Sequence, residues 1–169
     1  VETGGFLGFE LGADGGGGVH LCYPGSGSRT FEDPASVLRM NGREVFKFAT
    51  RVMVSSAEAV LEECGKTIAD VDVYVPHQAN KRIIDHAVGK LGVPVENTIV
   101  NVDRYGNTSS GSIPLALAEA RDDGRLRTGD LVLMTGMGAG LTWGSALLEW
   151  SGTSAGRKVS DGTATEGIR

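Results

Sequence analysis

Residues 71–80 read Val-Asp-Val-Tyr-Val-Pro-His-Gln-Ala-Asn, and this stretch decides the fold class. The run 71–75 predicts a buried strand that ends at Pro76, because proline cannot continue a ladder of hydrogen bonds. Over residues 80–91 the apolar side chains recur on one helical face, and Gly92 follows as a helix end. A buried strand followed by an amphipathic helix is typical of a β-α-β unit with a parallel sheet.

The rest of the chain continues the alternation of strands and helices. Further strands are expected at 5–10, 19–23, 98–102, 130–135 and 141–150, and further helices at 44–64 and 112–123. The last two strands are too close in sequence for a crossover helix, so they should be antiparallel. We therefore expect an α/β fold, with a mixed five-stranded sheet and helices packed on it.

One domain over residues 1–150 would hold all of these elements. The glycine-rich stretch 12–18 is interpreted as a surface loop, and residues 24–34 as a second loop. Residues 151–169 are mostly Gly, Ser, Thr and charged residues, which predicts a disordered tail.

The composition is that of a globular protein. Of the 169 residues, 40% are hydrophobic and 22% are charged, which excludes fibrous and wholly disordered classes. The formal net charge of −5 argues against a general nucleic-acid-binding protein, and no apolar run of about 20 residues predicts a membrane span. The first residues lack a signal-peptide pattern, and the two cysteines make no disulfide framework, so we expect a cytoplasmic protein.

Two polar loops that follow predicted strands carry His77 and Asn107. If the two strands are neighbours, these side chains converge, because functional groups gather at the carboxyl ends of parallel strands. Neutral His and Asn side chains can both donate hydrogen bonds to one oxygen, which stabilises an enolate or a tetrahedral intermediate. The simpler alternative is structural: a histidine satisfied by its turn, and an asparagine in a turn beside Gly106.

A third loop, residues 136–140 (Gly-Met-Gly-Ala-Gly), links the last two strands. Small residues let backbone N–H groups approach a ligand closely, although a tight hairpin would use the same residues. The spacing does not match a dinucleotide fingerprint. Cys22 and Cys64 are expected to be small buried side chains, and the cysteines and histidines lack the paired spacing of a zinc site, so we expect no metal.

Basic side chains gather on the two predicted helices on either side of the strand 71–75. Arg43 and Lys47 begin one helix, and Lys81, Arg82 and Lys90 lie on the other. They form either a solvated helix surface or a positive rim for an acidic or phosphate-bearing partner.

Three segments, in this order, resemble the motifs of the β-ketoacyl-acyl-carrier-protein synthase III family. Residues 75–83 (Val-Pro-His-Gln-Ala-Asn-Lys-Arg-Ile) are similar to its histidine motif. Residues 103–114 (Asp-Arg-Tyr-Gly-Asn-Thr-Ser-Ser-Gly-Ser-Ile-Pro) are similar to its asparagine motif, and residues 138–146 (Gly-Ala-Gly-Leu-Thr-Trp-Gly-Ser-Ala) to its closing glycine hairpin. Residues 40–47 also fit, and the similarity covers about residues 4–150.

The resemblance implies a thiolase-like fold of two similar halves, of which this chain is the C-terminal one. In that family an acyl group passes from acyl-CoA to a cysteine and is then condensed with malonyl-acyl carrier protein, with loss of CO₂, at the start of fatty acid synthesis. His77 and Asn107 would hold the thioester oxygen, and the backbone N–H of Ala139 would hold the acyl oxyanion. No cofactor is implied beyond the substrates acyl-CoA and malonyl-acyl carrier protein.

Binding residues and partners also follow from the resemblance. The carrier protein would contact Gln78, Ala79, Asn80, Lys81, Arg82, Lys47 and Lys90. The pantetheine arm of CoA would pass Gly42, Phe46 and Asn80. The implied partners are acyl carrier protein, acyl-CoA, the N-terminal half and, in the complete enzyme, a second copy in a homodimer.

Two departures from the family leave alternatives open. Ala139 stands where the family usually has glycine, and Met137 where an aromatic is frequent, so the acyl-chain preference is not fixed. The nucleophilic cysteine belongs to the N-terminal half and neither Cys22 nor Cys64 matches it, so the isolated chain is expected to be inactive. The alternatives are a starter-unit condensing or acyltransferring enzyme of polyketide biosynthesis on the same fold, and a non-catalytic carrier-protein docking module.

Overall fold

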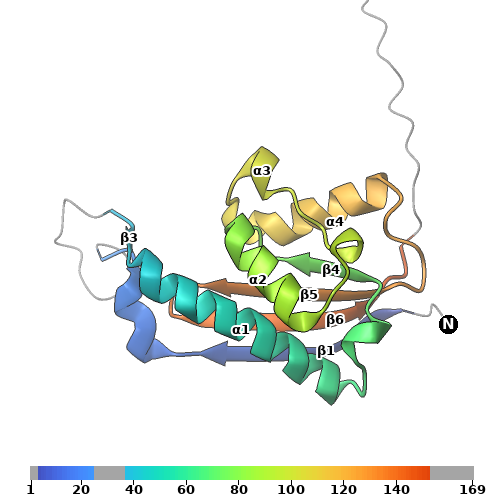
Figure 1. The fold of residues 1–169 in the computed structure, drawn as a ribbon, viewed down its shortest axis with the longest axis horizontal. Coiled ribbons are helices and arrows are strands. Elements are labelled where there is room, and N and C mark those ends of the chain that lie inside the picture. Colours follow the sequence, from blue (N-terminus) through green and yellow to red (C-terminus); the bar gives the residue numbers. More distant parts are fainter. Residues whose placement is uncertain (1–3, 25–36, 153–169) are drawn as a thin grey trace, which may run out of the picture.

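The computed structural model describes residues 4–24 and 37–152, and its centre is a mixed four-stranded sheet (Figure 1). In the order of the sheet, the strands are β1 (Gly5–Ala13), β6 (Thr142–Glu149), β5 (Leu131–Gly138) and β4 (Val73–Pro76). β4 is parallel to β5, whereas β6 is antiparallel to both β5 and β1. The predicted α/β class and the antiparallel final pair are confirmed. A separate two-stranded sheet joins β2 (Leu21–Cys22) to β3 (Arg39–Met40).

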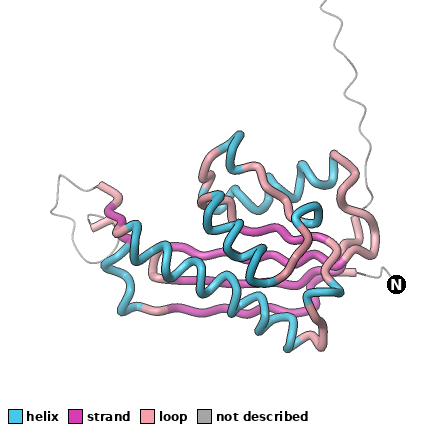
Figure 2. Tube along the Cα trace, in the orientation of Figure 1, coloured by secondary structure: helices cyan, strands magenta, loops and turns pink. Residues whose placement is uncertain are grey.

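Three helices pack on the four-stranded sheet (Figure 2). They are α1 (Gly42–Glu63), α2 (Lys81–Leu91) and α4 (Ser112–Asp122), and each lies within two residues of a predicted helix. Local sequence sets two of their starts: Asn41 Oδ1 accepts the N–H of Glu44, and Asn80 Oδ1 accepts the N–H of Arg82.

The two faces of the sheet carry separate cores. Leu131 and Leu133 of β5 pack with α1 and α2, whereas Val132 and Met134 pack with α4. Residues 131–135 are all buried, which explains why this strand reads as a continuous apolar run. The helices thus leave the carboxyl edge of the parallel pair β4 and β5 for loops.

Short helical segments fill most of the connections. They are η1 (Gly15–His20), η2 (Ile68–Asp70), η3 (Val95–Asn97), α3 (Val102–Tyr105) and η4 (Ser109–Gly111). The last two lie on either side of Asn107.

The predicted fifth strand, residues 98–102, is wrong. The segment makes one parallel bridge between Thr98 and Tyr74, and the N–H of Ile99 donates to the Tyr74 carbonyl at 2.9 Å. The physical reason is that η3 ends at Asn97 and α3 begins at Val102, which leaves only residues 98–101 between them, and Asn101, with ψ of 9°, is not extended. The sheet therefore has four strands within the described residues.

The prediction for the glycine-rich stretch also needs correction. β1 extends to Ala13, residues 15–20 form η1 rather than a strand start, and Gly17 is buried against Leu141. The Asp14 N–H donates to the Leu141 carbonyl at 2.7 Å, so the stretch is tied to the hairpin between β5 and β6. The predictions of a tail after residue 152 and of most of the loop 24–34 lie outside the described residues.

Both cysteines are half-buried rather than buried. Cys64 caps the end of α1 and packs against the core formed with α2.

In the part of the chain that the structure describes, no helix combines the length and the apolar character that crossing a membrane requires.

Candidate functional site

His77 lies directly after β4, with its main chain held by the neighbouring strand. Its N–H donates to the Thr135 carbonyl at 2.7 Å, and its ring Nδ1 lies 2.6 Å from Ser112 Oγ. The ring is half-buried, and this burial lowers the pKa of His77 below the ordinary 6.5. The imidazole is therefore neutral at neutral pH and can present one N–H as a donor.

Asn107 follows α3 through Gly106, whose φ of +66° allows the chain to turn sharply. The Oδ1 atom of Asn107 accepts a hydrogen bond from the Ser109 N–H at 2.9 Å. Its Nδ2 group has no acceptor among the residues that the structure describes. The donor end of this amide is thus free for a ligand.

His77, Asn107 and Ala139 line one cleft with a volume of about 930 Å³. This volume is in the range of sites that bind small molecules. Its apolar lining comes from Leu21, Leu38, Met40, Val45, Phe46, Ile83 and Met137. Of the binding residues expected from the sequence, Gly42, Phe46, Lys47, Ala79, Asn80 and Arg82 also line it.

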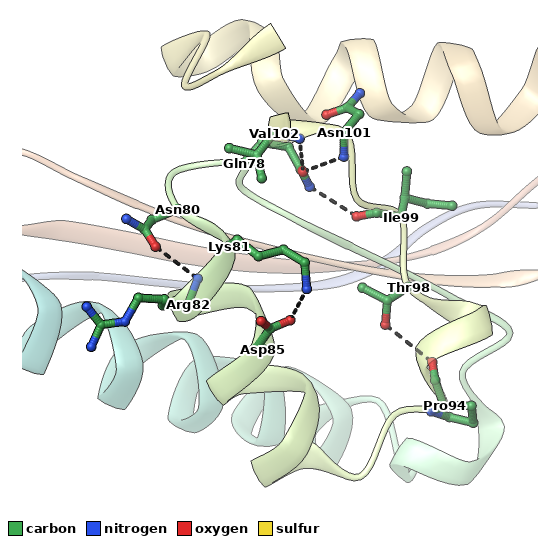
Figure 3. Close-up of polar contacts among 10 residues, drawn as sticks. All are labelled: Gln78, Asn80, Lys81, Arg82, Asp85, Pro94, Thr98, Ile99, Asn101 and Val102. Atoms are coloured by element: carbon green, nitrogen blue, oxygen red, sulfur yellow. Dashed lines mark hydrogen bonds and ion pairs between the residues drawn. The ribbon is translucent and has the colours of Figure 1, made fainter. Parts of the chain in front are cut away.

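Gln78 is placed differently from its expected role as a carrier contact. Its side chain is only 1% exposed and cannot reach a partner at the surface. As Figure 3 shows, its amide nitrogen donates to the Ile99 carbonyl at 3.1 Å, and its Oε1 accepts the N–H groups of Asn101 at 2.9 Å and Val102 at 3.1 Å. Gln78 therefore joins the loop that carries His77 to the segment that leads to Asn107.

The rim of the cleft is positively charged on one side. The Arg82 guanidinium lies over the Phe46 ring, 5.3 Å from its centroid, and Arg43 also lines the cleft. Lys47 pairs with Glu44 at 2.8 Å, and this hydrogen bond lowers the pKa of the Glu44 carboxyl.

Two of the expected carrier contacts do not line the cleft. Lys81 pairs with Asp85 on the exposed face of α2 (Figure 3). Lys90 is in the last turn of α2, roughly 12 Å from Arg82 along the helix axis. Arg82 is thus the residue of α2 best placed to act at the cleft mouth.

The sequence did not point to Ser112. This serine is the first residue of α4, is 1% exposed, and contacts the His77 ring. Ser112 lies in the segment 103–114 that resembles the asparagine motif, but a serine at a predicted helix start ordinarily indicates a cap. Within residues 4–24 and 37–152, no group of three or more His, Cys, Asp and Glu side chains could hold a metal ion.

A mixed sheet with helices on both faces, and two neutral hydrogen-bond donors beside one cleft, fit one half of a thiolase-like fold. A family model described as "3-Oxoacyl-[acyl-carrier-protein (ACP)] synthase III C terminal" matches residues 61–150. The chain belongs to this family.

Similar proteins agree with this assignment. The chain is 51% identical over 158 residues to "Beta-ketoacyl-[acyl-carrier-protein] synthase III 2" of Deinococcus radiodurans, covering 92% of this chain and 47% of that protein. A solved β-ketoacyl-acyl-carrier-protein synthase III of Thermus thermophilus is 52% identical with a TM-score of 0.80, over 89% of this chain and 47% of that one. The chain spans about half the length of the curated relatives it matches.

A second similar structure comes from a polyketide pathway. The priming β-ketosynthase of the R1128 polyketide biosynthetic pathway is 41% identical with a TM-score of 0.76, over 85% of this chain and 45% of that one. The fold is therefore shared by a β-ketoacyl-acyl-carrier-protein synthase III and by a priming ketosynthase of a polyketide pathway.

Proposed function

We propose that this chain forms the C-terminal half of a β-ketoacyl-acyl-carrier-protein synthase III, which condenses an acyl group from acyl-CoA with malonyl-acyl carrier protein. The observation that carries the proposal is the convergence of His77 and Asn107 on one cleft. Asn107 Oδ1 already accepts the Ser109 N–H, and His77 Nδ1 already contacts Ser112 Oγ, so Asn107 Nδ2 and His77 Nε2 are the atoms left to meet a ligand. Two such donors suit a thioester oxygen that gains negative charge.

The proposed chemistry begins at the malonyl carboxylate. The bond between this carboxylate and the α-carbon breaks, CO₂ leaves, and the electron pair moves into the thioester to form an enolate. Hydrogen bonds from His77 and Asn107 to the enolate oxygen stabilise this charge, and neither residue has to transfer a proton. Since burial keeps His77 neutral, its N–H acts as a dipole rather than as an acid.

The enolate carbon then attacks an acyl thioester held by the enzyme. The carbon–carbon bond forms, the acyl oxygen becomes an oxyanion, and its collapse expels a cysteine thiolate. We place the backbone N–H of Ala139 at this oxyanion, because Ala139 lies at the tip of the β5–β6 hairpin and lines the same cleft. The cysteine would come from the N-terminal half of the fold.

The carrier protein would dock at the basic side of the cleft mouth. Arg82, Arg43 and Lys47 line this side, and an acidic partner would be attracted to them. The phosphopantetheine arm would enter past Gly42, Phe46 and Asn80, which line the cleft as well.

Activity of a joined enzyme tests the catalytic assignment. The chain would be fused to the N-terminal half of the Thermus thermophilus relative, which is 52% identical in the matched half. The fusion should condense acetyl-CoA with malonyl-acyl carrier protein, and the 169-residue chain alone should not. His77→Ala should lower malonyl decarboxylation at least about 100-fold and leave acylation of the cysteine largely intact. If His77→Ala abolished acylation and spared decarboxylation, the catalytic role proposed for His77 would be wrong.

Titration of acyl carrier protein tests the docking surface. Arg82→Ala should weaken binding about tenfold, and the loss should shrink as salt is added, because interfacial charges are screened. Lys90→Ala is the matched control, since it removes a charge from the same helix but away from the cleft. Equal losses for the two variants would mean that net charge alone, not the cleft mouth, guides the carrier protein.

A second candidate is a starter-unit enzyme of polyketide biosynthesis, favoured by the similarity to the R1128 priming ketosynthase. Met137, which lines the cleft, would help to set which acyl chains fit. Comparing acetyl-CoA with longer and branched acyl-CoA substrates in the fusion would separate the two pathways. A non-catalytic docking module would instead bind carrier protein without any condensation by the fusion.

The complete enzyme would work in the cytoplasm as a homodimer. The strand β1 offers support for a protein interface, because one of its edges is unpaired within the described residues and its side chains Phe6, Phe9 and Leu11 are exposed. Sedimentation of the fusion would test the dimer.

A further inference from the structure

Ser112 is a buried hydroxyl that contacts two groups of the loop after β4. Its Oγ lies 2.6 Å from His77 Nδ1 and 3.3 Å from the backbone nitrogen of Gln78. The residue is 1% exposed at the start of α4, so water does not compete for these contacts. The hydrogen bonds of this hydroxyl therefore determine which nitrogen of the His77 ring carries the proton.

The proton of Ser112 can be assigned from its partners. The Gln78 N–H can only donate, so Ser112 Oγ accepts that hydrogen bond. The hydroxyl proton of a buried serine also needs an acceptor, and among the described residues its partner is His77 Nδ1. Nδ1 therefore carries a lone pair, and in a neutral ring the proton is on Nε2.

We propose that Ser112 is a positioning residue that fixes His77 in the tautomer with the proton on Nε2. The inference rests on the proposed function, because it makes His77 a donor toward the thioester oxygen. In the other tautomer, Nε2 would present a lone pair to the developing enolate and repel it.

Residues 109–112 also orient the second donor, the side-chain amide of Asn107. Asn107 Oδ1 accepts the Ser109 N–H at 2.9 Å, which leaves the Nδ2 end for the ligand. Residues 109–112 thus occupy the acceptor atom of both side chains, once through a backbone N–H and once through a hydroxyl. One short segment orients both donors before substrate binds.

The tautomer can be measured on the 169-residue chain without any substrate. Long-range ¹⁵N–¹H NMR of the histidine rings, recorded above the pKa of His77, distinguishes protonated from unprotonated ring nitrogens. The chain has three histidines, so His20→Gln and His86→Gln variants assign the signals. The expected result for His77 is a fully protonated Nε2 and an unprotonated Nδ1. A proton on Nδ1 in the unaltered chain would overturn the proposal.

Variants of Ser112 separate positioning from packing. Ser112→Ala should give a mixture of tautomers, Ser112→Thr should keep the Nε2 proton because it keeps the hydroxyl, and the control Ser110→Ala should change nothing. Ser110 is exposed two residues away and has no side-chain hydrogen bond within the described part of the chain. A single unchanged tautomer in Ser112→Ala would overturn the role of the hydroxyl.

Kinetics of the fusion enzyme extend the test. Ser112→Ala should lower kcat for malonyl decarboxylation about five- to tenfold, the effect of losing one hydrogen bond, with little change in KM or in cysteine acylation. A loss confined to KM would contradict positioning. If the tautomer is as proposed and the unaltered fusion does not condense, the proposed function fails and the Ser112 contact stands. If condensation occurs and Nδ1 carries the proton, the proposal about Ser112 fails alone.

Discussion

Replacing Gln78 by leucine would remove four hydrogen bonds from the interior at almost constant volume. The Gln78 amide nitrogen donates to the Pro76 carbonyl at 2.8 Å and to the Ile99 carbonyl at 3.1 Å, and Oε1 accepts two backbone N–H groups. Each buried group left without a partner costs roughly 1–3 kcal/mol, and carbonyls tolerate the loss better than N–H groups. Asn101 is buried and Val102 half-buried, so water can reach the second N–H in part. The expected loss in the free energy of unfolding is about 3 kcal/mol.

Urea unfolding of the 169-residue chain, followed by circular dichroism, would measure this loss. Thr98→Val is the matched control: it also replaces a buried polar side chain by an apolar isostere, and it removes a single hydrogen bond of 3.3 Å to the Pro94 carbonyl (Figure 3). Its expected cost is about 1 kcal/mol or less. If Gln78→Leu costs no more than Thr98→Val, then Gln78 does not hold the two loops together and the reasoning is refuted.

Gln78→Glu gives the same test a pH dependence. A carboxylate would still accept the two N–H groups, but it would face the Pro76 and Ile99 carbonyls, and its burial would raise its pKa. Because the folded state then holds the proton more tightly than the unfolded state, the variant is most stable relative to the parent chain below the unfolded pKa, about 4.3. The difference from the parent should grow as the pH rises through the raised pKa. A difference that is constant with pH would contradict burial of this side chain.

Three further measurements test other parts of the structure. Gly18→Ala should lower the free energy of unfolding by about 1 kcal/mol or more, because the added carbon would lie 3.0 Å from the Gly140 carbonyl oxygen in the β5–β6 hairpin. The control Gly15→Ala should be neutral, because its added carbon meets nothing within 4 Å. Equal effects of the two variants would refute the packing of Gly18 against the hairpin. The NMR titration midpoint of His77 should fall below 6.5, so its share of stability is present above that pH and is lost as the pH falls through the lowered pKa; a midpoint above 6.5 would contradict its burial. Tyr74→Phe removes a buried 2.7 Å hydrogen bond to the Thr135 hydroxyl and should lower the free energy of unfolding by about 1–2 kcal/mol, measured by thermal or urea unfolding. No loss would mean that the Thr135 hydroxyl finds another partner in the variant.

The elements with strong local signals could be predicted from the sequence. The helices α1, α2 and α4 follow from apolar periodicity and from the residues at their ends, and β5 follows from an apolar run that is buried on both faces. The cleft residues His77 and Asn107 could be named because each is a polar side chain just beyond an apolar run. What could not be predicted is the burial of a polar side chain, since Gln78 in a loop reads as a surface residue.

The absence of the predicted fifth strand and the burial of Gln78, which we expected at the surface, have one physical cause: the hydrogen bonds of the Gln78 side chain. Successive N–H groups of a strand point to opposite sides, whereas in the structure the N–H groups of Asn101 and Val102 both donate to Gln78 Oε1. Asn101 is the N-cap of α3 and Val102 its first residue, so the same oxygen ends the extended segment and caps the helix. After α3 the chain turns at Gly106 and reaches Asn107, which lines the same cleft as His77. A regular fifth strand would carry the chain past the sheet edge where His77 lies, so the arrangement of both donors depends on the one side chain that interrupts the strand.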